Sequence, residues 1–229
     1  MLDGHFRPSL IEACRNAFEA VLRTYLRQHG HEPNRGVQRH CLPMPFTPPC
    51  FTPDFFFDAD VLDIVRGVLG ERTVADQWSC DVPLSGSEHQ GPHADYQRPL
   101  FEETPDLSLP PYILVVSFGL VPIVAANGPI EIAPGTHLMR RADALRAIHA
   151  GEIELKPVPL ATGDVLIRHP WALHRGTPNT MDSPRPLATI RYVRAWYADA
   201  SREVEAIPRL VWEVLTPEQR RMMRFPLLD

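Results

Sequence analysis

The segment "YILVVSFGLVPI" (residues 112–123) decides the class of fold. Its β-branched and almost continuous apolar residues predict a strand that is buried on both faces. Four more short apolar segments follow, separated by turns with proline and glycine: "GPIEIAPGTHL" (128–138), "GEIELKPVPL" (151–160), "GDVLIRHPWALHRG" (163–176) and "RPLATIRYVRAWYA" (185–198). This pattern predicts a mainly β fold, a sandwich or double-sheet jelly roll, with flanking α-helices packed outside.

The regions around these strands are predicted to be helical. Residues 10–28 carry apolar side chains at three- and four-residue steps, which indicates an amphipathic helix. A second helix is expected at 58–69, where an aspartate opens the segment and Gly70 can cap its end. Residues 142–150 predict a short helix between strands, and residues 201–224 a helical tail with a kink near Pro208.

Residues 32–57 differ from both patterns. They are rich in proline and aromatic residues, and we expect no regular element there. The aromatic side chains must pack against something. The part at 40–57 is either a lid over a site or part of the core, and the sequence leaves both alternatives open.

The totals place the chain among globular proteins. Its 229 residues suit one domain, with N-terminal helices at 10–70, a core at about 76–198 and the tail at 201–224. The hydrophobic fraction is 44% and the charged fraction 22%, so a sizeable core is expected. A net charge of −5 with scattered basic residues argues against a nucleic-acid partner.

The lack of a visible targeting signal and the cysteine pattern both favour the cytoplasm. No run of 18 apolar residues suggests a membrane span, and no signal peptide is visible. The four cysteines form no C-x-x-C pair, which makes a zinc ribbon a weak prediction. We therefore expect a cytoplasmic protein with reduced thiols, no membrane partner and an oligomeric state that the sequence leaves open.

The stretch "GPHADYQRP" (91–99) carries the first candidate site residues. His93 and Asp95 are two residues apart, so in an extended segment both side chains leave the same face. The pair alone suits either a metal site or an ordinary turn. His174 follows the strand in 163–176, and Arg185 begins the next strand eleven residues later. Two antiparallel strands joined by that loop would bring His174 and Arg185 into one cavity.

Two imidazoles and one carboxylate make a specific metal-binding device. Bound on one face of a metal, they leave three positions open, which is typical of non-haem Fe(II) oxygen chemistry. The open positions accept a bidentate 2-oxo acid and dioxygen. An arginine deeper in the pocket would pair with the remote carboxylate of a dicarboxylic 2-oxo acid in a planar bidentate contact.

Four segments resemble the phytanoyl-CoA dioxygenase-like (PhyH) branch of the Fe(II)/2-oxoglutarate-dependent oxygenases. "QGPHAD" (90–95) is similar to the family's Gln-x-x-His-x-Asp, and "NGPIEIAPGTHL" (127–138) to its Asn-Gly strand and Pro-Gly turn. "GDVLIRHPWALHRGTPN" (163–179) resembles its Gly-Asp strand with the distal histidine, and "SPRPLATIRY" (183–192) contains the spaced arginine. The resemblance covers about residues 65–195 in the right order.

The resemblance implies a double-stranded β-helix, or cupin-like, core and a reaction. Fe(II), 2-oxoglutarate and O2 would oxidise an unactivated C–H bond of a small or medium organic molecule, most simply by hydroxylation and with release of succinate and CO2. Specialised metabolism is a suitable setting. The resemblance also implies six site residues: the iron ligands His93, Asp95 and His174, and the 2-oxoglutarate contacts Arg185, Gln90 and Asn127.

Two other functions remain open. A cupin-like metalloenzyme that works without a 2-oxo acid would not need Arg185, and a non-catalytic relative would only bind a ligand. Weaker site candidates are Arg191 as a second arginine behind the pocket, His169 or Trp171 in the pocket or in the core, His137 as a structural residue, and Tyr96, Gln97 and Arg98 as substrate contacts.

Overall fold

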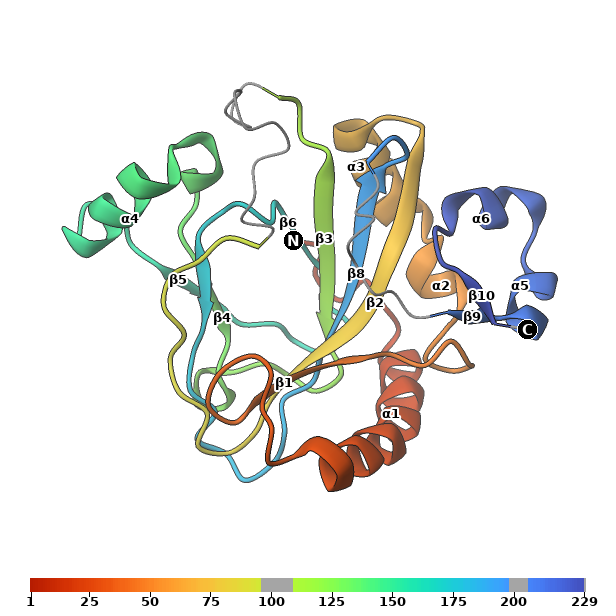
Figure 1. Ribbon diagram of the computed structural model, residues 1–229, viewed down its shortest axis with the longest axis horizontal. Coiled ribbons are helices and arrows are strands. Elements are labelled where there is room, and N and C mark those ends of the chain that lie inside the picture. The colour runs from red at the N-terminus through yellow and green to blue at the C-terminus, as the bar shows by residue number, and fades with distance from the viewer. Residues whose placement is uncertain (96–108, 198–205, 229) are drawn as a thin grey trace.

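Two antiparallel sheets form the centre of the computed structural model, which describes residues 1–95, 109–197 and 206–228 (Figure 1). The larger sheet has five strands, in the order β1 (Arg39–Pro43), β2 (Thr73–Pro83), β8 (Leu187–Arg194), β3 (Ile113–Gly119) and β6 (Leu166–Arg168). The smaller sheet has three, in the order β5 (Lys156–Val158), β4 (Ile130–Ile132) and β7 (His174–Gly176). The fold is therefore mixed α/β with antiparallel main sheets.

Helices cover the outer face of the larger sheet and the ends of the molecule (Figure 1). The helices on that face are α1 (Pro8–His29), α2 (Pro53–Phe56) and α3 (Ala59–Leu69), while α4 (Arg141–His149) lies beside the smaller sheet. The helices predicted at 10–28, 58–69 and 142–150 are confirmed by α1, α3 and α4. The Asp58 carboxylate caps α3 by accepting the Val61 N–H at 3.0 Å, and Gly70 ends it.

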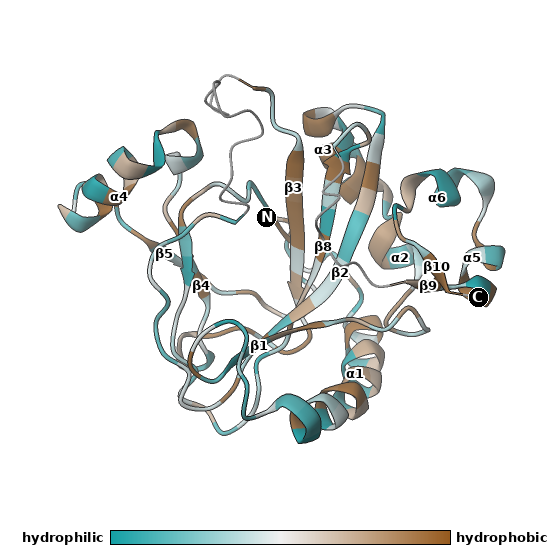
Figure 2. Cartoon of the chain, viewed as in Figure 1, coloured by the Kyte–Doolittle hydropathy of each residue, from teal (hydrophilic) through white to brown (hydrophobic). Residues whose placement is uncertain are grey.

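Side-chain alternation in the larger sheet separates two environments. In β3, Leu114, Val116 and Phe118 pack into the main core with the helices, whereas Val115 and Ser117 face the smaller sheet. All seven residues of β3 are buried, which confirms the strand predicted from its apolar sequence. Figure 2 shows β3 as apolar over most of its length.

The expectation of no regular element in residues 32–57 is wrong at two places. Among the described strands, β1 lies at the edge of its sheet and pairs with β2 alone, ending at Pro43, and α2 begins at Pro53 behind the Thr52 cap. Elements of five and four residues are too short to show a period in the sequence. Four aromatic residues of this segment are at most 4% exposed and belong to the main core: Phe46, Phe51, Phe55 and Phe56. Phe57 is half-buried and packs against the same core, which decides against the lid.

The C-terminal region is helical only in part. Residues 201–205 lie outside the described residues. After them comes β9 (Ile207–Pro208), which pairs in parallel with β10 (Leu227–Leu228), and α5 (Arg209–Val214) and α6 (Pro217–Met222) lie between these two strands in the chain. The sequence had suggested a helix kinked near Pro208. Pro208 instead lies directly before α5 and does not kink a helix. In the described part of the chain, no helix combines the length and hydrophobicity that crossing a bilayer requires.

Candidate metal centre

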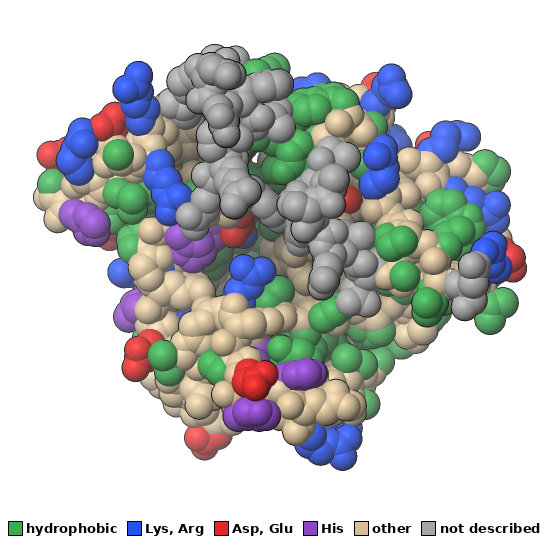
Figure 3. Space-filling model, in the orientation of Figure 1, with side chains coloured by type: hydrophobic (Ala, Val, Ile, Leu, Met, Phe, Trp, Pro, Cys, Tyr) green, Lys and Arg blue, Asp and Glu red, His purple; other side chains and the backbone are tan. Residues whose placement is uncertain are grey.

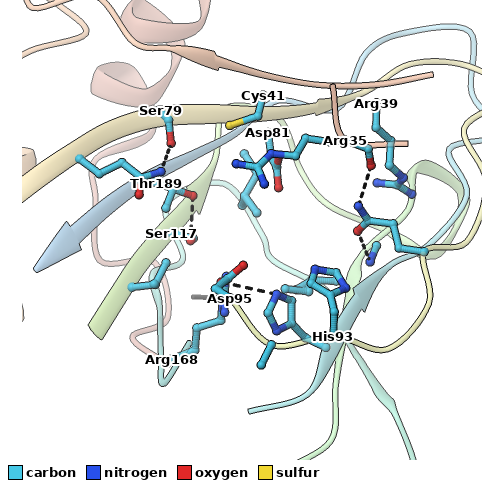
Figure 4. A pocket seen from close by; sticks show the side chains of 18 residues that line it. Arg35, Arg39, Cys41, Ser79, Asp81, His93, Asp95, Ser117, Arg168 and Thr189 are labelled. Carbon is cyan, nitrogen blue, oxygen red and sulfur yellow. Dashed lines mark hydrogen bonds and ion pairs between the residues drawn. The ribbon is translucent and has the colours of Figure 1, made fainter. Parts of the chain in front are cut away.

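A cavity of about 400 Å³ lies between the two sheets (Figure 4). Its walls are the inward-facing residues of β2, β3, β6 and β8 on one side and of β4 and β7 on the other. Polar side chains line the larger sheet: Gln77, Ser79, Ser117 and Thr189. Among them, the Gln77 amide donates to the Ser79 hydroxyl at 2.6 Å, and the hydroxyls of Ser117 and Thr189 lie 3.0 Å apart.

The backbone brings His93 and His174 together from distant parts of the chain. The N–H of each residue donates to the carbonyl oxygen of the other, at 2.9 Å in both directions, which forms an isolated antiparallel bridge. Residues paired in this way present their side chains on the same face. The two imidazole rings accordingly lie 4.6 Å apart between centroids.

The Nδ1 atom of each imidazole makes a hydrogen bond to the main chain. Nδ1 of His93 lies 2.9 Å from the carbonyl oxygen of Gly91, and Nδ1 of His174 lies 2.8 Å from that of Ala172. Because a carbonyl oxygen only accepts, both Nδ1 atoms carry the hydrogen. Nε2 of each ring therefore keeps its lone pair, as a metal ligand requires.

Asp95 completes the group. One carboxylate oxygen lies 3.6 Å from Nε2 of His174, and the Asp95 N–H donates to the carbonyl oxygen of Pro170 at 3.0 Å. One donor atom from each of His93, Asp95 and His174 lies within 4.8 Å of the others. The structure thus brings together the three residues that the sequence nominated as ligands.

Arg168, at the end of β6, holds the Asp95 carboxylate. Its Nη2 donates to that carboxylate at 2.8 Å, and the exposed fractions of the two side chains are only 13% and 27%. Burial alone would raise the pKa of Asp95, but Arg168 and His174 outweigh it and hold this pKa well below its usual range. Burial also lowers the pKa of His93. A charged carboxylate and a neutral imidazole are the states in which both residues bind metal.

Arg185 lies deep beside the cavity, next to Asp81 and Arg39, which line it. It is 3% exposed, and burial lowers its pKa to about 10 although Asp81 opposes the shift. Its Nε and Nη1 have no hydrogen-bond partner among the described residues. A buried cation with open donors fits an anionic group, since leaving such donors unpaired is costly. The predicted carboxylate of 2-oxoglutarate suits this place.

Gln90 lines the cavity, but its amide is committed to the backbone. Nε2 donates to the carbonyl oxygen of Arg35 at 2.8 Å, and Oε1 accepts the N–H of Gly176 at 2.9 Å. Gln90 therefore ties the loop before β1 to β7. A Cβ at Gly176 would lie 2.5 Å from Nη1 of Arg39 and 2.8 Å from this Oε1, so a larger residue there would push the Arg39 and Gln90 side chains aside.

Asn127 does not contact the cavity, in contrast to the predicted 2-oxoglutarate contact. Its Oδ1 accepts the N–H of Val124 and its Nδ2 donates to the carbonyl oxygen of Pro122, both at 2.8 Å. Both polar groups of the side chain are thus used within the local turn. The Asn-Gly motif has a structural explanation in this chain.

The weaker candidates are mostly structural. Arg191 makes two hydrogen bonds of 2.7 Å with the carboxylate of Asp76, and both residues are buried. His137 stacks on His169 with ring centroids 5.0 Å apart, and Trp171 packs against hydrophobic clusters, as core residues do. Tyr96, Gln97 and Arg98 lie outside the described residues.

Three arginines at the cavity were missed from the sequence: Arg35, Arg39 and Arg168. Arg39 is buried and donates to the carbonyl oxygens of Glu88 and Thr177. Arg168 had a usable signal, because it lies two residues after the buried Leu166 and so shares the inward face of that strand. Arg35 has no such signal, since it comes from an irregular loop.

The family model for phytanoyl-CoA dioxygenase (PhyH) matches residues 1–187, most of the chain. The chain belongs to the phytanoyl-CoA dioxygenase family. This confirms the resemblance that the four sequence segments carried.

Several solved structures share the fold of this chain. The carbocyclase SnoK from nogalamycin biosynthesis, described as non-haem and α-ketoglutarate-dependent, is 20% identical, with a TM-score of 0.60 over 79% of this chain and 75% of its own. The epimerase SnoN, in complex with Fe3+, α-ketoglutarate and nogalamycin RO, is 17% identical, with a TM-score of 0.61 over 85% and 78%. HygX from Streptomyces hygroscopicus, with nickel, 2-oxoglutarate and hygromycin B bound, is 16% identical, with a TM-score of 0.59 over 100% and 90%. At these identities the likeness shows the fold.

Proposed function

We propose that this member of the phytanoyl-CoA dioxygenase family is an Fe(II)- and 2-oxoglutarate-dependent oxygenase acting on a small or medium organic molecule. The observation that carries the proposal is the convergence of two Nε2 atoms and one carboxylate in the cavity, beside a buried arginine with unpaired donors. The two sheets then correspond to a double-stranded β-helix core within a single domain. The ligands seen with SnoN and HygX support the same assignment.

Each residue has a defined task in this proposal. His93, Asp95 and His174 hold the iron, and Arg185 pairs with the distal carboxylate of 2-oxoglutarate. Bound iron with 2-oxoglutarate and O2 supplies the oxidising power for attack on a C–H bond, and succinate and CO2 are released. The carbonyl groups of Gly91 and Ala172 keep both imidazoles in the tautomer and orientation that this site needs.

Hydroxylation is the outcome we propose for the C–H bond, because it needs no acid or base beyond the groups in the cavity. SnoK is a carbocyclase and SnoN an epimerase, so the same fold also serves other outcomes. A product analysis with oxygen-18 gas tests this point, since hydroxylation places the label in the product.

The test of the proposed function is succinate formation on addition of Fe(II), 2-oxoglutarate and O2. We expect wild type to form succinate and His174→Ala to lose at least 100-fold of the rate. His149→Ala, at an exposed position at the end of α4, is the matched control and should equal wild type. Undiminished succinate formation by His174→Ala would contradict the metal site.

A calorimetric titration separates this function from the cupin-like alternative. 2-Oxoglutarate is added to the Ni(II)-loaded protein, which binds the co-substrate without turnover. The proposal requires binding that Arg185→Gln weakens. Metal-loaded protein that takes up no 2-oxoglutarate would favour a metalloenzyme without a 2-oxo acid.

A further inference from the structure

The charges around the cavity do not balance. Three guanidinium groups lie around one carboxylate, since Asp81 acts on Arg35, Arg39 and Arg185 and favours the charged form of each. The only other carboxylate in the described lining is Asp95, and Arg168 already pairs with it. Under the proposed function, the distal carboxylate of 2-oxoglutarate neutralises one of the three arginines. The described residues then still leave a positive charge without a counter-ion.

Arg35 is the remaining arginine, an exposed side chain at the cavity whose guanidinium contacts the Cys41 thiol and is attracted by Asp81. Arg185 is assigned to the co-substrate. Arg39 donates hydrogen bonds to the carbonyl oxygens of Glu88 and Thr177. Among the described residues, no carboxylate oxygen lies within 4.0 Å of the Arg35 guanidinium. Its side chain instead extends into the cavity toward Asp81 and Cys41 (Figure 4).

The loop that carries Arg35 is built to hold it there. The side chain of Asn34 brackets Cys41, accepting its N–H at 2.7 Å and donating to its carbonyl oxygen at 2.8 Å. The Arg35 N–H donates to the carbonyl oxygen of Arg39 at 3.2 Å, and the Arg35 carbonyl oxygen accepts from Gln90. An irregular surface loop fixed by four such bonds presents its side chain at a defined place, beside the strand that begins with His174.

The remaining wall also favours a polar ligand. In the described part of the chain no Phe, Tyr or Trp side chain lines the cavity, and its face on the larger sheet combines polar groups (Gln77, Ser79, Ser117, Thr189) with Val115 and Leu187. Flat apolar ligands are usually held by aromatic and aliphatic walls. In Figure 3, basic, acidic and histidine side chains lie close together near the centre of the visible face.

We propose that the substrate carries an anionic group, a carboxylate or a phosphate, and that Arg35 binds it at the mouth of the cavity. This inference rests on the proposed function and names the substrate class of the same site. Arginine suits this task because its planar fork can donate two hydrogen bonds to either group.

The test measures anion binding to the full chain loaded with Ni(II) and saturating 2-oxoglutarate, which occupies the co-substrate position. Inorganic phosphate and acetate are the probes, used at constant ionic strength because surface charges are screened by salt. Binding is followed by the shift in melting temperature. We expect phosphate or acetate to bind wild type in the millimolar range, and the stronger of the two identifies the anionic group.

The variants assign that binding to Arg35. Arg35→Gln should weaken anion binding at least 10-fold, since it removes one charge-assisted pair. Arg35→Lys should restore part of it, and Arg23→Gln, at an exposed position on α1, should equal wild type. Failure of both anions to bind the loaded wild type would overturn the inference, and so would equal binding by wild type and Arg35→Gln.

2-Oxoglutarate binding by the same samples separates the two proposals. If Arg35→Gln weakens 2-oxoglutarate binding as much as anion binding, Arg35 belongs to the co-substrate site and the substrate assignment fails. If wild type binds phosphate in an Arg35-dependent way but no 2-oxoglutarate, the anion site stands and the proposed function fails.

Discussion

Replacing Arg168 with methionine tests how the metal centre is held in the absence of metal. Methionine keeps much of the apolar stem of arginine but removes the charge and the donors. In the metal-free protein, Asp95 then loses its closest positive partner, at 2.8 Å. In the metal-loaded protein, the ion itself is the counter-charge of Asp95. We therefore expect Arg168→Met to destabilise the metal-free protein far more than the Ni(II)-loaded protein.

The magnitude follows from the contact. A hydrogen bond to a charged group contributes about 1.5–3 kcal/mol, and the exposed fractions of 13% and 27% leave this pair only weakly screened by solvent. We expect a loss of about 2 kcal/mol without metal and less than about 1 kcal/mol with Ni(II). For a domain of this size, about 2 kcal/mol corresponds to a fall in melting temperature of about 4–8 °C.

The stability difference between wild type and Arg168→Met should depend on pH. The pKa of Asp95 is lower in the folded protein than in the unfolded chain, where it is about 3.9. Its contribution to stability is therefore present above about pH 4 and is lost as the pH falls toward the folded value. The difference in stability between wild type and Arg168→Met should be largest near neutral pH and should narrow below about pH 4.

Thermal and urea unfolding with EDTA, and again with saturating Ni(II), provide the measurement. The control is Arg175→Met, which breaks a comparable ion pair, to Glu131 at 2.6 Å, on the neighbouring strand. The control should lose the same stability in both conditions. An equal loss for Arg168→Met with and without Ni(II) would refute the idea that Arg168 balances Asp95 in place of the metal.

Three further predictions concern other residues. Arg185→Gln should raise the dissociation constant of 2-oxoglutarate about 10- to 100-fold by calorimetry on the Ni(II)-loaded protein, because a buried charge-assisted contact is lost; an unchanged constant would remove Arg185 from the co-substrate site. Asp76→Asn should lower the free energy of unfolding by about 3–5 kcal/mol in urea, since it removes the negative charge of a buried carboxylate that pairs with the Arg191 guanidinium at 2.7 Å; a loss below about 1 kcal/mol would contradict this. Tyr192→Phe removes a buried hydroxyl that donates to the carbonyl oxygen of Phe56 at 2.8 Å, and should cost about 1–2 kcal/mol without changing Ni(II) affinity.

The sequence predicted the residues whose signal is local and periodic. The helices α1 and α3 and the strand β3 carry their own apolar patterns, and α3 also its Asp58 cap, so tertiary contacts were not needed to find them. His93 and Asp95 were visible because their spacing places both side chains on one face of an extended segment. The short elements β1 and α2 were missed, because their boundaries depend on pairing with β2 and packing in the core.

The missed site residues have a common physical cause. Arg35 reaches the cavity only because Gln90 and Asn34 fix its loop, and these contacts join segments that are far apart in sequence. Gln90 and Asn127 were assigned from a motif, but a motif does not show which backbone groups an amide already satisfies. The structure shows that both amides are used for backbone contacts.

The reciprocal backbone hydrogen bonds between His93 and His174 bear on which ion the protein acquires. Because the main chain sets the spacing of the two imidazoles, the protein does not have to refold around a particular metal. Nickel, copper and zinc bind such nitrogen and oxygen donors more tightly than ferrous iron. Occupancy is then governed by the supply of each ion in the cell or in the culture medium, and a preparation carrying zinc or nickel would be inert until it is stripped and reloaded.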